Sequence, residues 1–512
     1  MAELIEEART LAGQAPDLLL LIDRDLDQKA LEAKALRVAD AKHHKDTHPN
    51  LPEEQHWDCD SDAPCALAKG GRKRTPALII LVALFIRGRY RSLTDIMTRD
   101  RIADSASFQL LLDEHNTDTV CPTVLARHAN NLSKATVTRL MNAQVEAYKT
   151  EELDDFDIFM ADSTAVRANS EWPKDSRVIL KHCDRAITIL EHFEKKQWCR
   201  IRWYNMKKWQ RQVHNLARDI DFTCGKSNGA KKRRKLYRKL LPLASKLVAR
   251  LGDEWDRIEP ILNSVGLCPS KAKQRSQATE LLETTLMNAE NLIPYVYVRT
   301  QENRNEEREE HERVLSVVDG HASIICKGGR EPNFGYKPQL AASRSGFITA
   351  AIVTIGNPSD AQSLFPLLNA HIARCGVTPS LGTVDDGYAG AQNWQLAVKT
   401  CGLKALSMNG SKGKAVVDKI DPELWTSEAY KEGRRLRGLM ESPISVLKQV
   451  NGLDRMRRSG IDAVEREIFE KIIAYNAVRA VQLRKRAAER RARTTASRAR
   501  LELVEPPLTR CG

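Results

Sequence analysis

Three carboxylates stand at points in the chain where side chains from distant segments can meet. Asp162 ends a strand that is expected from Phe156, and Asp385 ends a strand that is expected from Leu381. Glu441 lies instead in a segment with helical spacing. Open α/β sheets gather ligands beyond the carboxyl ends of their strands, so the two aspartates can converge on one site. Several carboxylates can hold two divalent ions that together activate a water or hydroxyl and stabilise the leaving oxygen in phosphodiester cleavage.

Two basic residues accompany Glu441 at helical spacing. Arg437 precedes it by one turn and Lys448 follows it by two turns, so all three are expected on one helical face, although a kink at Pro443 would weaken this for Lys448. An arginine there can bind a DNA phosphate bidentately. Hard carboxylate ligands favour Mg²⁺ or Mn²⁺ over softer metals, and two ions are expected.

Plainer explanations exist for each acid taken alone. A lone aspartate at a strand end is more often a turn or capping residue, and an Arg–Glu pair one turn apart is usually a surface salt bridge. Asp386 competes with Asp385 as a ligand, although the strand end favours Asp385. Asp319 is a candidate auxiliary acid, but a turn residue of a hairpin is the favoured interpretation. The catalytic interpretation depends on the whole set occurring together and in order.

A separate group of residues contains types that bind zinc. Its spacings match no regular zinc motif, so a structural zinc site is not favoured. The group consists of His43, His44, His48, His56, Cys59 and Cys65.

The segments that must position the carboxylates alternate between strand and helix patterns. Further strands are expected at Val314 to Val318, Ala322 to Cys326 and Leu403 to Met408, with a hairpin formed by Tyr336 to Ala342 and Phe347 to Ile355. Helices are expected from Ser359 or Asp360 to Gly376, Ala389 to Cys401, Glu428 to about Gln449, and Ala463 to Ala496. This order predicts an α/β fold with a mixed sheet flanked by helices.

The predicted catalytic domain is interrupted and flanked by helical regions. It comprises residues 151–167 and 313–480, after a helical amino-terminal region, 1–150, for DNA binding or dimerisation. That region contains an apolar helix, Ala77 to Ile86, and a helix capped by Ser133 that would suit a helix-turn-helix DNA reader. Residues 168–312 form a basic helical insertion, and 481–512 a basic helix and tail. In the insertion, phosphate contact and a merely solvated face are equally supported for Lys231, Lys232, Arg233 and Arg234.

Composition limits the class of protein. The chain has 512 residues, of which 42% are hydrophobic and 29% charged, a globular balance. Its net charge of +14 favours a polyanionic partner, because phosphate contacts release counterions. The amino terminus mixes acids and bases, unlike a secretory signal, and the longest apolar run is too short for a bilayer. Eleven scattered cysteines suit reduced thiols, so a cytoplasmic protein is expected.

These motifs resemble the DDE transposases of bacterial insertion sequences, whose catalytic domain is RNase H-like. In that family the first Asp lies in Asp-Gly/Ser-Thr, as in Asp162-Ser163-Thr164, and the second in Asp-x-Gly-Tyr, as in Asp385 to Tyr388. The third acid lies in Tyr-x2-Arg-x3-Glu-x6-Lys, whose last three elements are matched by Arg437, Glu441 and Lys448. The motif's tyrosine is absent, because its position holds Arg434 and the nearest tyrosine is Tyr430. Supporting similarity covers Tyr336 to Asp360 and Leu453 to Asn476, the latter including Arg455.

The resemblance implies an activity and its partners. Asp162 and Asp385 would share two Mg²⁺ or Mn²⁺ ions, and Glu441 would ligate one of them. The enzyme would cut double-stranded DNA at the element's ends and use the freed 3′-hydroxyl to attack target DNA, near the nucleoid of a bacterial cytoplasm. Arg437, Lys448 and Arg455 would contact DNA, and pairing of two ends implies at least a homodimer. The alternatives are an RNase H-like nuclease without strand transfer and a catalytically silent DNA-binding descendant, which the three retained carboxylates disfavour.

Overall fold

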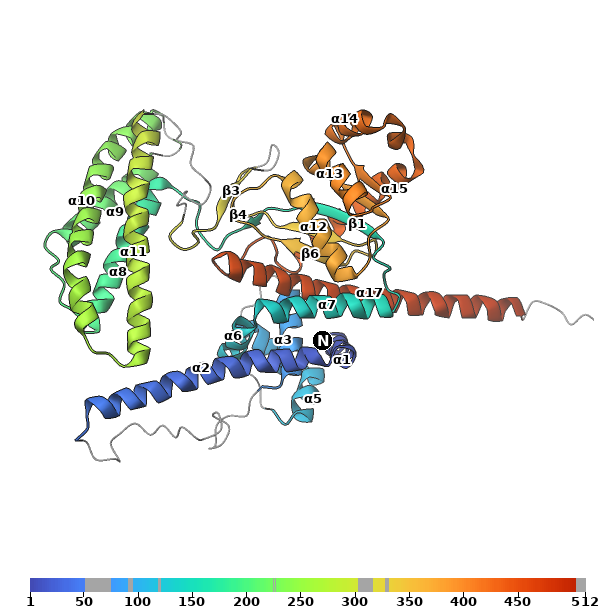
Figure 1. The fold of residues 1–512 in the computed structure, drawn as a ribbon, viewed down its shortest axis with the longest axis horizontal. Coiled ribbons are helices and arrows are strands. Elements are labelled where there is room, and N and C mark those ends of the chain that lie inside the picture. The colour runs from blue at the N-terminus through green and yellow to red at the C-terminus, as the bar shows by residue number, and fades with distance from the viewer. Residues whose placement is uncertain are drawn as a thin grey trace, which may run out of the picture. The chain divides into compact units, whose positions relative to one another are not determined.

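The structure divides into two compact units. Unit 1 consists of Met1–Gln28, Arg72–Arg167 and Cys326–Gly512, and unit 2 of Lys29–Gly71 and Ala168–Ile325 (Figure 1). This computed structural model describes residues 1–50, 75–90, 95–117, 121–223, 225, 227–302, 316–326 and 331–502.

A five-stranded mixed sheet lies at the centre of unit 1. Across the sheet the strands are β6 (Ile348–Ile352), β5 (Gln339–Ala342), β1 (Ile158–Ser163), β7 (Leu381–Val384) and β8 (Ala405–Met408). β5 is antiparallel to both neighbours, whereas β1, β7 and β8 are parallel. Numbered along the chain, these strands have the order 3-2-1-4-5, an RNase H-like arrangement. The predicted α/β fold class with a mixed sheet is confirmed.

Both faces of this sheet are covered, which explains the near-continuous apolar sequence of β1. On one face Phe159 and Ala161 pack in a single apolar cluster with Leu364 and Leu368 of α12 (Asp360–Cys375). On the other face α15 (Glu428–Arg437) packs against β7 and β8. Successive residues of β1 point to opposite faces, so Asp162 lies on the face opposite to Phe159 and Ala161.

The edge strand β6 is protected by a long helix, α17 (Ile461–Glu502). The Asn476 side chain of that helix accepts a hydrogen bond from the Ile348 N–H and donates one to the Ile348 carbonyl, both at 2.9 Å. Main-chain groups of an edge strand otherwise pair with other chains, so this contact closes the edge. Figure 1 shows α7 running alongside α17, and the two helices are in contact.

The amino-terminal part of unit 1 is helical, as predicted. The apolar segment after Pro76 forms α3 (Ala77–Arg89), which is buried along most of its length against α17. Ser133 caps α7 by accepting a hydrogen bond from the Thr136 N–H at 3.1 Å. No helix among the described residues combines the length and apolarity needed to cross a membrane. The helices of this part are α1 (Ala2–Gln14), the start of α2 (Asp17–Thr47), α3, α4 (Asp95–Ala103), α5 (Ala106–Glu114), α6 (Pro122–Asn131) and α7 (Lys134–Thr150).

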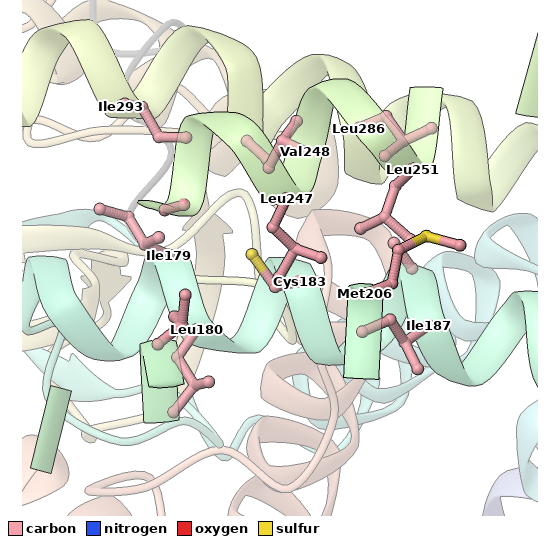
Figure 2. Close-up of a cluster of buried hydrophobic side chains, with 14 of the residues drawn as sticks. Ile179, Leu180, Cys183, Ile187, Met206, Leu247, Val248, Leu251, Leu286 and Ile293 are labelled. Atoms are coloured by element: carbon pink, nitrogen blue, oxygen red, sulfur yellow. The ribbon is translucent and has the colours of Figure 1, made fainter. Parts of the chain in front are cut away.

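Unit 2 contains four long helices that follow β1 in the chain and precede β5. They are α8 (Asp175–Lys195), α9 (Met206–Asp221), α10 (Gly229–Ser264) and α11 (Pro269–Tyr297), followed by the π-helix η2 (Val298–Glu302) and by β3 (Ser323–Ile325). All four helices contribute to one apolar core, shown in Figure 2 by Ile187, Met206, Leu251 and Leu286. Each helix buries one apolar stripe there, as amphipathic spacing requires.

Some predicted elements were wrong. Within Val314 to Val318 the described residues from Ser316 onward form no strand, because the Ser316 hydroxyl accepts hydrogen bonds from the N–H groups of Val318 and Asp319 and so favours a turn. The strand from Tyr336 is divided at Pro338, which has no N–H to donate. Its first part is β4 (Asn333–Tyr336), which pairs with β2 (Val166–Arg167). The helix from Ala389 begins later, as α13 (Ala391–Gln395) and the π-helix η5 (Leu396–Thr400), and a further helix, α14 (Ser411–Ile420), was not predicted.

A buried histidine makes the stability of unit 1 depend on pH. The His371 ring lies edge-on to Phe159, and its Nδ1 is 2.6 Å from the Thr349 hydroxyl. Burial lowers the pKa of His371 to about 4. The unfolded chain therefore takes up a proton between about pH 6.5 and pH 4 that the native chain does not bind, so this contribution to stability is complete above the window and is lost as the pH falls through it.

We expect a measurable difference between wild type and His371→Gln. Between pH 7 and pH 4.5 the free energy of unfolding of wild type should fall by about 2 kcal/mol more than that of the variant. Urea titrations of both proteins at the two pH values measure this. Equal losses would show that protonation of His371 makes no contribution.

Candidate catalytic site

The register between β1 and β7 brings the first two predicted acids together. These parallel strands pair Ile158 with Leu381 and Met160 with Thr383. The same offset continued to the strand ends places Asp162 beside Asp385. Neighbouring strands are about 4.8 Å apart, and positions separated by two residues face the same side of a sheet. Both carboxylates therefore lie on the face that α15 covers.

A guanidinium group joins the two carboxylates. Nη2 of Arg437, the last residue of α15, lies 3.0 Å from Asp162 Oδ2 and 3.7 Å from Asp385 Oδ2. The two carboxylate oxygens are thus no more than about 7 Å apart, which suits ligands of a site with two metal ions about 4 Å apart. The Arg437 and Asp162 side chains are only 17% and 13% exposed, so solvent screens their attraction less than that of a surface pair.

Asp386, the competing ligand, has structural partners of its own. Its carboxylate accepts hydrogen bonds from the N–H groups of Gly413 at 2.8 Å and Lys412 at 3.3 Å, in the first turn of α14. A carboxylate is stabilising at a helix N-terminus, where the partial charge is positive. Gly410 has φ of +114°, and a Cβ there would lie 2.2 Å from the Asp386 carboxylate. These contacts favour Asp385 over Asp386 as the ligand.

A further aspartate lies next to Asp385, at a position that the sequence predicts only as a helix cap. Asp360 Oδ1 is 2.9 Å from Lys337 Nζ and accepts a hydrogen bond from Gln339 Nε2 at 2.8 Å. A Cβ on Gly387 would lie 2.6 Å from Asp360 Oδ2 and 3.1 Å from Asp385 Oδ1. The glycine of the Asp-x-Gly-Tyr segment is therefore required because two carboxylates flank it.

Burial and charge have opposite effects on this second aspartate. Burial favours its neutral form, but hydrogen bonds from Gln339 and Lys337 outweigh burial and hold the pKa of Asp360 below its ordinary value. Asp360 is thus an anion that the Lys337 charge balances. The signal for this network in the sequence is that Lys337, Gln339 and Asp360 lie within the supporting similarity, Tyr336 to Asp360.

Tyr388 connects this network to the two aspartates. Its buried hydroxyl donates a hydrogen bond to Gln339 Oε1. Burial, together with the negative charges of Asp360, Asp162 and Asp385, raises the pKa of Tyr388 well above its ordinary value. The hydroxyl therefore remains a hydrogen-bond donor, and it ties the residue after Gly387 to the sheet.

Glu441 does not share a continuous helix with Arg437, and that prediction was wrong. α15 ends at Arg437, the 3₁₀ turn η7 (Gly438–Met440) follows, and α16 (Glu441–Gln449) begins at Glu441 itself. Pro443 lies in the first turn of α16, where its missing N–H leaves no hydrogen bond of the helix unmade. Each 3₁₀ residue turns the chain by roughly 20° more than an α-helical residue, which moves Glu441 by about 60° from the expected face.

The consequence is that Glu441 is solvent-exposed while Arg437 is mostly buried. η7 contacts β1, the strand that carries Asp162, and Glu441 directly follows η7 in the chain. Among the described residues, no three His, Cys, Asp or Glu side chains converge closely enough to hold a metal ion. The structure thus brings Asp162 and Asp385 together and leaves Glu441 apart from them in this conformation.

The basic residues predicted to contact DNA lie in several places. Lys448 is in the last turn of α16. Arg455 is exposed, in a segment that forms a β-bridge with Arg167. Glu467 of α17 anchors the same segment. Its carboxylate accepts hydrogen bonds from the main-chain N–H groups of Arg457 and Arg458.

The basic group of the predicted insertion lies in the first turns of α10 in unit 2. Lys231 and Lys232 are exposed there, while the Arg234 guanidinium donates a hydrogen bond to the Gln301 carbonyl. Asp319 is also in unit 2, buried at the start of a turn before β3. Of the zinc-capable group, His56, Cys59 and Cys65 lie outside the described residues.

Comparison with known families identifies one part of the chain. Residues 310–477, about a third of the chain, match the family model described as a transposase DDE domain. The matched segment includes β5, β7 and the helices that carry Arg437 and Glu441, so this part of the chain is a transposase DDE domain. No curated protein and no solved structure matches the chain.

We expect Gly387→Ala to destabilise the protein by about 1–3 kcal/mol, the usual effect of forcing extra atoms into a filled space. Asp360 cannot yield easily, because Lys337 and Gln339 hold its carboxylate. Gly390→Ala is the matched control, because the nearest atom to its added Cβ would be Asn393 Nδ2 at 4.0 Å, and its effect should stay within about 0.5 kcal/mol. Urea unfolding measures both, and equal effects would contradict the packing argument.

Proposed function

We propose that the protein is an insertion-sequence transposase that cleaves DNA at the element's ends and transfers the freed 3′ ends into target DNA. One observation carries the proposal: in a chain with a transposase DDE domain, Asp162 and Asp385 end register-matched parallel strands and share Arg437. Asp162 precedes the matched residues, so its assignment is supported by its position beside Asp385 and its contact with Arg437.

The residues at this site fit a hard divalent ion. Asp162 and Asp385 offer carboxylate oxygens on one face, and the chain already places a positive charge, the Arg437 guanidinium, against both. We assign Asp162, Asp385 and Glu441 as the ligands of Mg²⁺ or Mn²⁺, two ions in all. The bound ions would supply the Lewis acidity that activates a water or 3′-hydroxyl and stabilises the leaving oxygen. Glu441 has to turn from solvent toward the aspartates to complete this set.

The surrounding residues orient Asp385. Its Oδ1 accepts a hydrogen bond from the Gly387 N–H at 3.0 Å, which sets the direction of the carboxylate. Tyr388 and Gln339 attach this turn to β5, and Asp360 packs against Gly387. Ligands held by such a second layer of contacts keep their orientation when the metal arrives.

DNA binding would combine basic residues near the site with those of unit 2. Arg437, Lys448 and Arg455 would contact phosphates around the cleaved bond, and Lys231, Lys232, Arg233 and Arg234 would make additional phosphate contacts. The +14 net charge makes such binding favourable and dependent on salt. Pairing of two element ends requires at least a dimer.

We expect Asp162→Asn, Asp385→Asn and Glu441→Gln each to lower Mg²⁺-dependent nicking by about 100-fold or more, the loss typical when a group that stabilises developing charge is removed. The substrate is a plasmid bearing both ends of the element, analysed for nicked and strand-transfer products. Glu428→Gln is the control, because that α15 side chain is 90% exposed and pairs with Lys431 one turn later.

Undiminished nicking by Asp162→Asn would contradict the catalytic assignment. Metal-dependent nicking without strand-transfer products would favour a nuclease over a transposase. A wild-type protein that binds the ends but neither nicks nor joins them would indicate a silent DNA-binding descendant.

The contribution of α10 is tested by the salt dependence of DNA binding. Lys231→Ala combined with Lys232→Ala should weaken binding to a duplex and reduce the slope of log K against log salt by about 0.9 for each phosphate that the protein no longer neutralises. Lys271→Ala with Lys273→Ala is the matched control, because this pair is equally exposed in the first turns of α11. Fluorescence anisotropy at several salt concentrations measures both, and equal slopes for all three proteins would exclude α10 from the interface.

A further inference from the structure

The chain itself supplies a cation to the two aspartates. Arg437 Nη2 lies 3.0 Å from Asp162 Oδ2 and 3.7 Å from Asp385 Oδ2. Asp162 and Asp385 are the residues that we assign as metal ligands. A guanidinium and a divalent ion are both positively charged, so they compete for the same carboxylate oxygens.

The other two nitrogens of the Arg437 guanidinium donate no hydrogen bond to the described residues. Nε and Nη1 are buried and have no hydrogen-bond partner among the described residues. Arginine carries five donors in a planar fork that matches the oxygens of a phosphate. The protein therefore leaves donor capacity on Arg437 that a phosphate would satisfy and that the two carboxylates do not.

Neighbouring arginines on the same helix behave differently. The Arg434 guanidinium lies over the Trp425 ring, 4.4 Å from its centroid. Arg435 pairs with Glu432 one turn earlier at 2.8 Å, and its side chain is 71% exposed. Both have local partners, whereas Arg437 reaches from the end of α15 to the strand ends. The contact with the aspartates is thus specific to position 437.

We propose that Arg437 exchanges partners during the reaction cycle. In the free protein it neutralises Asp162 and Asp385; when a divalent ion replaces it at the carboxylates, it moves to a DNA phosphate. This rests on the proposed function, because the same aspartates are taken as the metal ligands. Release of Arg437 by either partner favours binding of the other, so divalent metal and DNA bind cooperatively, and the coupling is reciprocal.

The first test measures Mn²⁺ binding to the full chain without DNA, by isothermal titration and by the electron paramagnetic resonance signal of free Mn²⁺. Arg437→Gln removes the competing charge, so it should bind Mn²⁺ at least about tenfold more tightly than wild type, in line with the effect of a neighbouring opposite charge on a carboxylate. Arg435→Gln, the same change two residues earlier, should bind like wild type. Equal or weaker binding by Arg437→Gln would overturn the exchange.

The second test uses the unaltered chain, so it does not depend on the folding of a variant. Phenylglyoxal modifies accessible guanidinium groups, and mass spectrometry of the digested protein quantifies modification at each arginine. Mn²⁺ should increase modification of Arg437 several-fold and leave that of Arg435 unchanged. Unchanged or reduced modification of Arg437 at saturating Mn²⁺ would overturn the proposal.

The failure of this inference is distinguishable from failure of the proposed function. If Asp162→Asn abolishes Mn²⁺ binding and nicking while Arg437→Gln binds Mn²⁺ like wild type, the exchange is overturned and the transposase assignment stands. If Asp162→Asn leaves both Mn²⁺ binding and nicking unchanged, the carboxylate pair is not the metal site and both proposals are overturned.

Discussion

Two carboxylates at the ends of neighbouring parallel strands repel each other, and the arrangement of the site depends on how that repulsion is balanced. The register of β1 with β7 gives Asp162 and Asp385 no freedom to separate, because the main-chain hydrogen bonds of the sheet determine their spacing. Like charges held this close are costly unless a cation lies nearby. Arg437, from the end of α15, supplies that cation in the free protein.

A second balance of charge lies on the α12 side of the same edge. Asp360 adds another negative charge beside Asp385, and the buried Lys337 neutralises it. Gln339 and Tyr388 complete the hydrogen bonds between these residues, so the polar side chains on this side of the site have partners despite their burial. The turn after β7 is thereby held from both sides, by its own backbone and by the start of α12.

The segment from α15 to α16 combines a rigid element with an adaptable one. α15 packs against β7 and β8, and the Thr383 hydroxyl of β7 donates a hydrogen bond to the Gly433 carbonyl of α15 at 2.8 Å. These contacts fix the main chain of the helix that carries Arg437. The 3₁₀ turn after it carries poorer hydrogen-bond geometry than an α-helix and lies directly before Glu441. Under the proposed function, this division would keep Asp162 and Asp385 in position while Glu441 turns to join them.

Local sequence determined several of the strands and helices around the site. The apolar run before Asp162, the helix from Ser359 or Asp360 to Gly376, and the strand before Asp385 all follow from side-chain type and period. The structure has each of them, although β1 begins at Ile158, two residues after the expected Phe156. Tertiary structure alone decided the rest. Register between distant strands depends on hydrogen bonds that no local pattern encodes, so only the fold sets Asp162 beside Asp385, separated by more than 200 residues of chain. Likewise, Asp360 resembles an ordinary first-turn acid until Lys337 and Gly387 pack around it. The helical spacing of Arg437 and Glu441 gave no sign of the 3₁₀ turn between them, because that turn depends on the backbone and not on the pattern of side chains.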